Sequence, residues 1–257
     1  MIIAGIDVGI ENTKVAVLKD DIVIGRSTIS TGGADRPGQV QKAYEDALSA
    51  AGVGAGDVEK VVATGKGKFD VAFAAEVFTE MIAAARAAKY YFPEATSVMS
   101  VGADETLAAV LGDARPVGEF ALNQKCTAGL GTFLTYLVQR LGMTIEQAGA
   151  SDGPDAGVMN DGCVVFSELD ALSLMNNGAA PEAIMATAIR AAATRAATVL
   201  SDLTASPGTA TVLFGGLTKN PAFVKALEKF CGKKFLIPEY AEFGGAVGAA
   251  ICGVKGI

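Results

Sequence analysis

The stretch VGIENTKVAVLKDDIVIG (residues 8–25) aligns without a gap with a second stretch, VGADETLAAVLGDARPVG (residues 101–118). Eight of the 18 aligned positions are identical, and the offset between the copies is 93 residues. Each copy reads as an apolar strand, a glycine turn and a second apolar strand, which is the pattern of a β-hairpin. Hairpins can resemble one another through composition alone, but a fixed offset over two similar units favours a duplicated architecture.

Helical patterns follow each expected hairpin. Residues 72–93 read as a long helix that stops before Pro93. Residues 132–142 carry apolar side chains on one helical face and end at Gly142. We expect further helices at residues 168–178, at residues 181–203 with proline in the first turn, and from about Pro221. The sequence therefore predicts an α/β fold of two similar lobes with a cleft between them.

The composition and net charge of the chain limit the kinds of molecule that it is expected to bind. A length of 257 residues with 51% hydrophobic residues suffices for a substantial core. The net charge of −7 at pH 7 argues against nucleic acids and acidic membrane surfaces as partners. The first residues, MIIAGIDVG, lack the basic start of a signal peptide, and no uninterrupted apolar run reaches the roughly 18–20 residues that span a bilayer. We therefore expect a cytoplasmic protein.

The chain contains no histidine, which excludes Ser-His-Asp and Cys-His catalysis and every histidine-bearing metal site. The four cysteines form no C-x-x-C pair, so neither a zinc ribbon nor a disulfide framework is expected. They are Cys126, Cys163, Cys231 and Cys252. Any catalysis must then rest on carboxylates, lysines, backbone amides or cysteine.

The stretch GIDVGIENTK (residues 5–14) places Asp7 and Gly9 at the end of an apolar strand. Glycine lets backbone amides approach a phosphate, and a carboxylate at a strand end can hold Mg²⁺ directly or through water. We take Asp7 as a catalytic and magnesium-binding candidate. Gly9 and the residues that follow, Asn12, Thr13 and Lys14, are cofactor-binding candidates. An ordinary tight hairpin with a solvated aspartate gives the same pattern.

A second glycine turn follows a later apolar strand, in VLFGGLTKNPAF (residues 212–223). Gly215 and Gly216 there would permit a flat ring or a phosphate to approach the backbone and the start of the helix near Pro221. Together with Asn220 they are cofactor-binding candidates. A turn that only needs positive φ is the alternative.

These features together resemble the superfamily of sugar kinases, actin and heat-shock chaperone ATPases, which hold ATP between two duplicated lobes. The narrower resemblance covers nearly the whole chain and is to the BadF/BadG/BcrA/BcrD ATPase family, which contains activators of 2-hydroxyacyl-CoA dehydratases and ATPase subunits of benzoyl-CoA reductase. It is carried by NQKCTAGLGTFL (123–134), GCVVFSELD (162–170), LFGGLTKN (213–220) and FGGAVGAAICG (243–253).

The resemblance implies two ribonuclease-H-like lobes around a nucleotide cleft. The first lobe would span residues 1–92, with a C-terminal helix at about residues 240–257 packing back on it. The second lobe would span residues 93–239 and carry two cysteines that hold the cluster. ATP or ADP would bind in the cleft, with Gly215 and Gly216 near the adenosine.

The resemblance also assigns the cysteines. In that family, the cysteines that match Cys126 and Cys163 are cluster ligands, and two protomers contribute two thiolates each to one [4Fe–4S] cluster. A cubane of this kind needs about four thiolates, and helix N-termini near both cysteines would favour them. The alternative for Cys126 is a buried structural thiol. Cys231 and Cys252 match no ligand motif and are expected to be packing residues.

The second copy of the hairpin departs from the family pattern. The segment is SVGADE (residues 100–105), so Ser100 stands at the position equivalent to Asp7 and Ala103 replaces a glycine. Ser100 and Gly102 remain cofactor-binding candidates, and Asp104 or Glu105 could compensate for the lost carboxylate. The ATPase subunits of benzoyl-CoA reductase also vary in this segment, which favours that branch.

A second departure lies in the preceding helix, where the family carries a glutamate followed by a Cys-His pair. Glu80 stands 20 residues ahead of Ser100, but the pair is Ala83 and Ala84 here. Glu80 is a catalytic candidate for orienting the attacking water, with a solvent-facing helix residue as the alternative.

The resemblance thus implies an ATP-dependent electron-transfer component. It would pair with itself or with a related ATPase subunit, accept electrons from a ferredoxin or flavodoxin, and deliver them to a CoA-thioester reductase or dehydratase. Two alternatives remain open. One is a nucleotide-binding structural subunit that does not hydrolyse ATP, as the change at Ser100 suggests. The other is a small-molecule kinase, for which 257 residues leave little room for a substrate-binding insertion.

Overall fold

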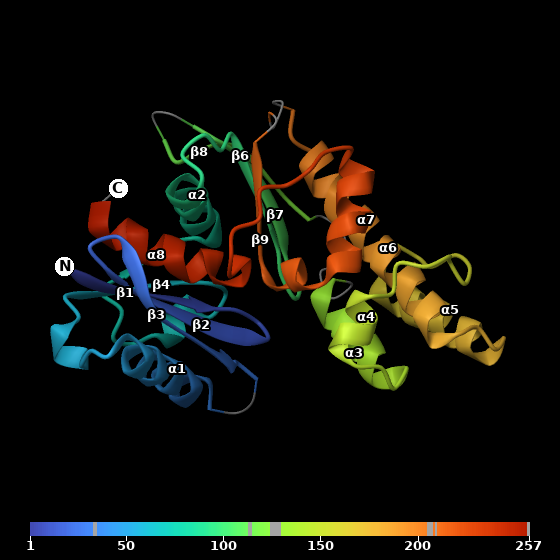
Figure 1. Ribbon diagram of the computed structural model, residues 1–257, viewed down its shortest axis with the longest axis horizontal. Helices are drawn as coiled ribbons and strands as arrows, with labels where there is room; N and C mark the ends of the chain where they lie inside the picture. Colours follow the sequence, from blue (N-terminus) through green and yellow to red (C-terminus); the bar gives the residue numbers. More distant parts are fainter. Residues whose placement is uncertain (33–34, 113–114, 124–129, 205–207, 209, 256–257) are drawn as a thin grey trace.

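The computed structural model describes the chain except for residues 33–34, 113–114, 124–129, 205–207, 209 and 256–257. Two sheets dominate it (Figure 1). The first has the strand order β3-β2-β1-β4-β5 and the second the order β8-β7-β6-β9. The strands are β1 Ile2–Val8, β2 Asn12–Lys19, β3 Ile22–Ser30, β4 Lys60–Thr64, β5 Glu76–Val77, β6 Ser97–Val101, β7 Thr106–Leu111, β8 Val117–Leu122 and β9 Thr211–Phe214.

The two sheets repeat the same topology. In each sheet an antiparallel meander, β1-β2-β3 or β6-β7-β8, is followed by a later strand, β4 or β9, parallel to its first strand. Shifting β1 to β3 by the 93-residue offset places them over β6 to β8 to within two residues at every end. The predicted duplication and the predicted α/β fold class are therefore confirmed.

Helices form the outer layers and the centre. They are α1 Arg36–Ala51, α2 Glu80–Tyr91, α3 Gly131–Arg140, α4 Ile145–Gly149, α5 Val164–Asn176, α6 Pro181–Ser201, α7 Pro221–Cys231 and α8 Gly244–Lys255. Helix α1 covers the outer face of the first sheet, and α6 with its neighbours covers the outer face of the second. Helices α8 and α2 lie between the two sheets (Figure 1).

We use first lobe for the first sheet with α1, and second lobe for the second sheet with α3 to α7. Helix α8 packs on β1, β2 and β4 and on α2, while α2 packs on β6 and β7. The chain thus returns at its C-terminal end to the first sheet. The domain boundaries at residues 92–93 and 239–240 stay predictions.

The close approach of α8 to its neighbours depends on glycines, which have no side chain at the points of contact. A Cβ built on Gly248 would lie 1.8 Å from the carbonyl oxygen of Ala83 in α2. A Cβ built on Gly5 in β1 would lie 1.9 Å from the carbonyl oxygen of Ala246 in α8. Real Cβ atoms do not approach a backbone oxygen this closely, so glycine is required at both crossings. The glycines and alanines of α8 therefore set the thickness of the central layer.

Two predicted helices begin elsewhere than expected. The helix expected at residues 72–93 begins only at Glu80, because residues 76–77 pair with β4 and Thr79 caps the helix by accepting a bond from the Ile82 N–H. The helix expected at residues 168–178 begins at Val164, directly after Cys163. The apolar pattern of the sequence predicted which faces of these helices are buried, but it did not predict the residues at which the helices begin.

Helix α6 is the core helix of the second lobe. Among the described residues, α6 is long and apolar enough to cross a membrane by length and composition, and 67% of its most apolar window is buried within the protein. Its alanines pack under β7 and β8 and against α7. Burial of this extent is what a core helix shows.

Candidate functional site

A cleft of about 330 Å³ lies between the two lobes. Its walls come from β1, β2 and the loop after β4 on one side, and from β6, β7, α3 and the residues after β9 on the other. Ten of the predicted site residues line it: Asp7, Gly9, Asn12, Lys14, Glu80, Ser100, Gly102, Gly215, Gly216 and Asn220. Residues more than 200 positions apart in the chain thus share one cavity.

The two hairpin turns that face the cleft are built alike. In the first lobe the N–H of Gly9 donates to the carbonyl oxygen of Asn12 at 3.1 Å. In the second lobe the N–H of Gly102 donates to the carbonyl oxygen of Glu105 at 2.8 Å. The two bonds join positions that differ by the 93-residue offset of the sequence repeat. The duplication therefore extends to the turns that frame the cavity.

A second mirrored pair of turns follows the parallel strands. Gly65 after β4 has φ +92°, and a Cβ on it would lie 2.4 Å from the carbonyl oxygen of Val8. Gly215 after β9 has φ +105°, and a Cβ on it would lie 2.1 Å from the carbonyl oxygen of Val101. Both positions need glycine for conformation and for space. Gly215 was predicted from the sequence and Gly65 was not, although both glycines follow an apolar strand.

Asp7 lies half-buried at the end of β1, opposite Lys14 in the β1–β2 ladder. Burial raises the pKa of the Asp7 carboxyl, the charge of Lys14 lowers it and the charge of Glu80 raises it, with a net upward shift. The charged form of Asp7 therefore costs free energy in the folded protein, and a shift of this kind marks candidate functional groups.

This shift predicts how stability depends on pH. Because the folded-state pKa is above the ordinary value of 3.8, the stability contribution of Asp7 is full below that value and is lost as pH rises through the folded-state pKa. We therefore expect Asp7→Asn to raise the melting temperature at pH 7, without nucleotide or Mg²⁺, and the gain to vanish below about pH 3.8. Asp20→Asn, on the exposed turn after β2, is the control and should give no gain. A gain at pH 7 that persists unchanged into acid would contradict this origin.

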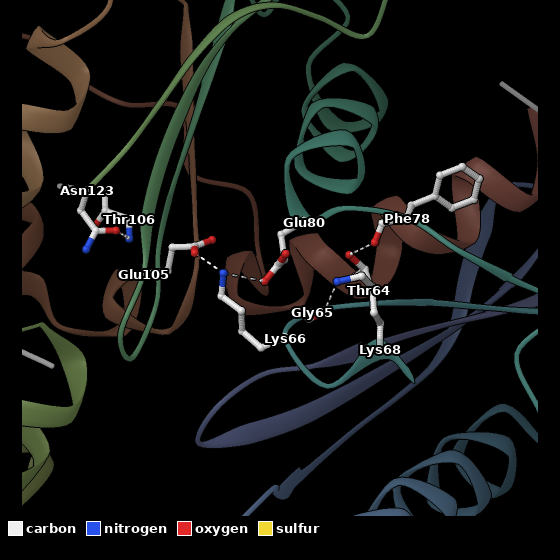
Figure 2. Close-up of polar contacts among 9 residues, drawn as sticks. All are labelled: Thr64, Gly65, Lys66, Lys68, Phe78, Glu80, Glu105, Thr106 and Asn123. Carbon is white, nitrogen blue, oxygen red and sulfur yellow. Dashed lines mark hydrogen bonds and ion pairs between the residues drawn. The ribbon is translucent and has the colours of Figure 1, made fainter. Parts of the chain in front are cut away.

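The loop after β4 adds a lysine that no sequence pattern singled out. Figure 2 shows Lys66 extending between Glu80 of α2 and Glu105 of the β6–β7 turn. Its Nζ lies 3.6 Å from Glu80 Oε1, and it forms a hydrogen-bonded ion pair with Glu105. Partial burial lowers the pKa of Lys66, but the hydrogen bond to Glu105 and both carboxylate charges raise it, with a net upward shift. Lys66 stays charged at neutral pH.

The second-lobe side of the cleft is largely apolar. Leu134 and Val138 of α3, Ile145 and Ala148 of α4, and Leu217 line it. Lys219 and Glu242 also line the cleft and form an ion pair of 2.5 Å. The cavity thus has a charged end, around Asp7, Lys66, Glu80 and Glu105, and an apolar wall of a kind that accepts a flat ring.

Two of the predicted cofactor-binding residues, Thr13 and Asn220, form hydrogen bonds within the protein. Thr13 is fully buried and its hydroxyl bonds that of Thr31 at 2.9 Å, so it lies outside the cleft lining. Asn220 lines the cleft, but its Oδ1 accepts the N–H of Phe223 at 2.9 Å and caps α7. The sequence could not separate these structural roles from ligand contacts, because both favour small polar residues after a strand.

Cys163 is the N-cap residue of α5, on the second lobe and away from the cleft lining. Its N–H and that of Gly162 both donate to Asn160 Oδ1, at 2.7 and 2.9 Å, which fixes the turn before the helix. The guanidinium of the buried Arg195 donates to the carbonyl oxygen of Asp161 at 2.6 Å, which fixes the same turn from the core side. Cys163 is a free cysteine and is partly exposed.

The predicted partner of Cys163 within the chain, Cys126, lies outside the described residues. Among the residues that the structure describes, no group of three or more potential ligands can hold a metal ion. A free, partly exposed thiol fits one corner of an iron–sulfur cluster, whose ligands are cysteine sulfurs. The remaining corners would have to come from Cys126 and from a second chain.

The chain has relatives of known and unknown role. It is 31% identical over 253 residues to the uncharacterized protein YjiL of Escherichia coli, covering 98% of this chain and 96% of the relative. It is 28% identical to the activator of lactoyl-CoA dehydratase of Anaerotignum propionicum, covering 96% and 95%. It is 29% identical over 222 residues to one of the subunits of the benzoyl-CoA reductase of Thauera aromatica, covering 83% and 77%.

Solved structures share the fold. The activator of the 2-hydroxyisocaproyl-CoA dehydratase from Clostridium difficile, with bound ADPNP, matches with a TM-score of 0.88 at 24% identity, covering 98% of this chain and 93% of the other. A ROK family glucokinase from Streptomyces griseus matches with a TM-score of 0.61 at 16% identity, covering 97% and 98%. The actin and sugar-kinase fold that the resemblance implied is thus confirmed.

The family model of the BadF/BadG/BcrA/BcrD ATPases matches residues 4–253, which is nearly the whole chain and includes both hairpins, the cleft and Cys163. With the duplicated lobes and the mirrored turns, this match confirms the resemblance seen in the sequence. The chain belongs to the BadF/BadG/BcrA/BcrD ATPase family.

Proposed function

We propose that this protein is an ATP-dependent electron-transfer component. It binds Mg-ATP in the cleft between the lobes and shares one [4Fe–4S] cluster with a second ATPase subunit. It passes a low-potential electron to a CoA-thioester dehydratase or reductase. The observation that carries the proposal is the pair of mirrored glycine turns, residues 9–12 and 102–105, that face one cleft from opposite lobes.

The charges of the cleft favour a nucleotide that carries a metal ion. The described lining residues include six carboxylates, Asp7, Glu11, Glu80, Asp104, Glu105 and Glu242, and three lysines, Lys14, Lys66 and Lys219. A bare triphosphate would be repelled by this excess of negative charge, and a divalent cation held near Asp7 removes the repulsion. Glu80, at the start of α2, is placed beside the charged end, where it would orient the attacking water.

The relatives support the nucleotide and the partner class. One solved relative has bound ADPNP, a triphosphate analogue. Others are an activator of lactoyl-CoA dehydratase and a subunit of benzoyl-CoA reductase. We therefore extend to this chain a CoA-thioester enzyme as electron acceptor and a ferredoxin or flavodoxin as donor.

The surface around Cys163 supports the second subunit. Five large apolar side chains are exposed on α5 and the loop before it: Val158 (89%), Val165 (58%), Phe166 (58%), Leu169 (55%) and Met175 (37%). An apolar face of this kind marks a protein interface. When bound, the cluster would supply single-electron transfer at low potential. Cys163 and Cys126 would hold it, with α5 directing its N-terminus at the thiolate.

Coupling between the two sites would act through the lobes. A nucleotide that binds one arrangement of the lobes more tightly than another shifts the balance between them. Because α5 belongs to the second lobe, such a shift alters the position of Cys163 relative to the partner.

The first test is iron and sulfide content on anaerobically purified protein, with an EPR spectrum of the reduced state and an ATP turnover assay. About four irons per two chains with a [4Fe–4S] signal support the proposal. Protein that stays free of iron after anaerobic reconstitution, alone and with a related subunit, would reject the cluster.

Asp7→Asn tests the metal role of the cleft. We expect ATP turnover to fall by about 100-fold or more, because losing a group that merely orients a metal ligand already costs about 10–100-fold. Glu45→Gln, on the exposed face of α1, is the matched control and should retain full turnover. Turnover of the Asp7→Asn protein within a factor of about three of the unaltered chain would exclude Asp7 as the metal-holding residue.

Ser100 favours a second candidate, a subunit that binds nucleotide without hydrolysing it. Ser100 lines the cleft at the position that Asp7 occupies in the first lobe, so one carboxylate of a symmetric pair is absent. Nucleotide binding without turnover by the chain alone, and turnover when a related subunit is added, would favour this candidate. Turnover by the chain alone would reject it.

A further inference from the structure

An ion pair crosses the cleft between the two lobes. Lys66 lies on the turn at residues 65–67 of the first lobe, and Glu105 lies on the β6–β7 turn of the second lobe. Figure 2 shows the Lys66 side chain reaching from the loop after β4 toward Glu105, with Glu80 on its other side. The side chain of Lys66 is 46% exposed and that of Glu105 is 23% exposed. The contact therefore joins the lobes at the open surface of the cavity.

Both ends of this ion pair belong to turns that frame the charged end of the cleft. Glu105 stands at the repeat position of Asn12, and its carbonyl oxygen accepts the N–H of Gly102. On the other side, a Cβ built on Gly65 would lie 2.7 Å from Asp7 Oδ1, so the turn carrying Lys66 packs directly on Asp7. The Lys66 ammonium is thus placed where the two phosphate-binding turns would meet.

The other cleft lysines are placed differently. Lys14 Nζ lies 3.5 Å from the carbonyl oxygen of Asn12, within its own hairpin. Lys219, in the short helix that follows β9, pairs with Glu242. Among the described lysines that line the cleft, Lys66 alone bridges the two hairpin-bearing sheets.

We propose that Lys66 binds the terminal phosphate of a nucleoside triphosphate. It pairs with Glu105 when no triphosphate is bound, and it moves to the terminal phosphate when a triphosphate binds. The proposal rests on the proposed function, because it requires that the cleft bind ATP. A terminal phosphate carries more charge and more acceptor oxygens than one carboxylate, so it competes well for a lysine. The Lys66–Glu105 ion pair is partly open to solvent, where ion pairs contribute little stability, so leaving Glu105 costs little.

This assignment makes Lys66 a specificity-determining residue. A diphosphate, which lacks the terminal group, would leave the Lys66–Glu105 ion pair in place. A triphosphate would break it and release the contact between the lobes. Since coupling is reciprocal, an ion pair that opposes triphosphate binding is in turn weakened by the triphosphate.

The test compares the affinities of ADP and of AMP-PNP, a non-hydrolysable ATP analogue, by titration calorimetry with Mg²⁺. For Lys66→Met we expect AMP-PNP to bind about tenfold more weakly, the size expected for one charge-assisted hydrogen bond, with ADP affinity held within about twofold. For Glu105→Gln we expect AMP-PNP to bind about two- to fivefold more tightly, since Lys66 is then held by Glu80 alone. Lys66→Arg keeps the charge and should retain most of the preference for the triphosphate.

Lys68→Met is the matched control. Lys68 lies two residues further on, its Nζ bonds the carbonyl oxygen of Gly65 at 3.3 Å, and it does not line the cleft. The variant removes the same charge and should leave both affinities within about twofold. Three results would overturn the assignment of Lys66. Lys66→Met could lose the same affinity for both nucleotides, it could lose no affinity for either, or Lys68→Met could show the same loss of AMP-PNP affinity. Absence of any nucleotide binding by the unaltered chain would instead overturn the proposed function, and this inference with it.

Discussion

Replacing Cys163 by alanine is expected to remove all cluster iron from the protein while leaving its nucleotide affinity unchanged. A [4Fe–4S] cluster shared by two chains needs about four thiolates, so the loss of Cys163 from each chain leaves only half of them. The nucleotide site should be insensitive, because Cys163 caps α5 and does not line the cleft. Iron and sulfide content after anaerobic reconstitution, together with calorimetric titration of ADP, measures both effects.

The matched control is Cys231→Ala. Burial raises the pKa of Cys231 to about 11, so it remains a thiol at neutral pH and is a poor ligand. Its replacement should retain the iron content of the unaltered protein. A Cys163→Ala protein with full iron content would remove Cys163 from the ligand set.

Gly248→Ala is expected to destabilise the fold by about 3 kcal/mol or more, at the upper end of overpacking effects. The added Cβ would lie 1.8 Å from the carbonyl oxygen of Ala83, and that oxygen belongs to the backbone of α2. Neither helix can yield freely, because α8 is fixed against the first sheet and α2 against the second. Urea denaturation at constant slope measures the loss through the shift in midpoint.

Gly56→Ala provides the comparison for this substitution. A Cβ on Gly56 meets nothing within 4 Å, and its backbone is in a region open to any residue. We expect its free energy of unfolding to stay within about 0.5 kcal/mol of the unaltered protein. Equal stability of the two variants would show that α8 and α2 separate readily, and that the central layer is looser than the contact between Gly248 and Ala83 requires.

The repeat explains why so much of the fold could be predicted. Strand order within a hairpin is local, so the repeat at residues 8–25 and 101–118, which joins the three strands of each meander, was enough to indicate both meanders. The glycine turns at Gly9, Gly102 and Gly215 were also local signals, and all three face the cleft.

Other features depended on partners that are distant in the chain. The start of α2 at Glu80 was missed because residues 76–77 are drawn into the first sheet by β4. Thr13 reads like its polar neighbours in the turn, yet strand alternation points it into the core toward Thr31. No pattern within either segment carries this information.

Local sequence was sufficient to predict the duplicated α/β architecture and the glycine turns, since each rests on residues close together in the chain. The position of Lys66 between Glu80 and Glu105 depended instead on the assembled fold. Those three residues belong to segments that meet when α2 and α8 bring the two sheets together. Long-range electrostatic contacts of this kind have no periodicity in sequence, because side-chain charges interact through space rather than along the chain.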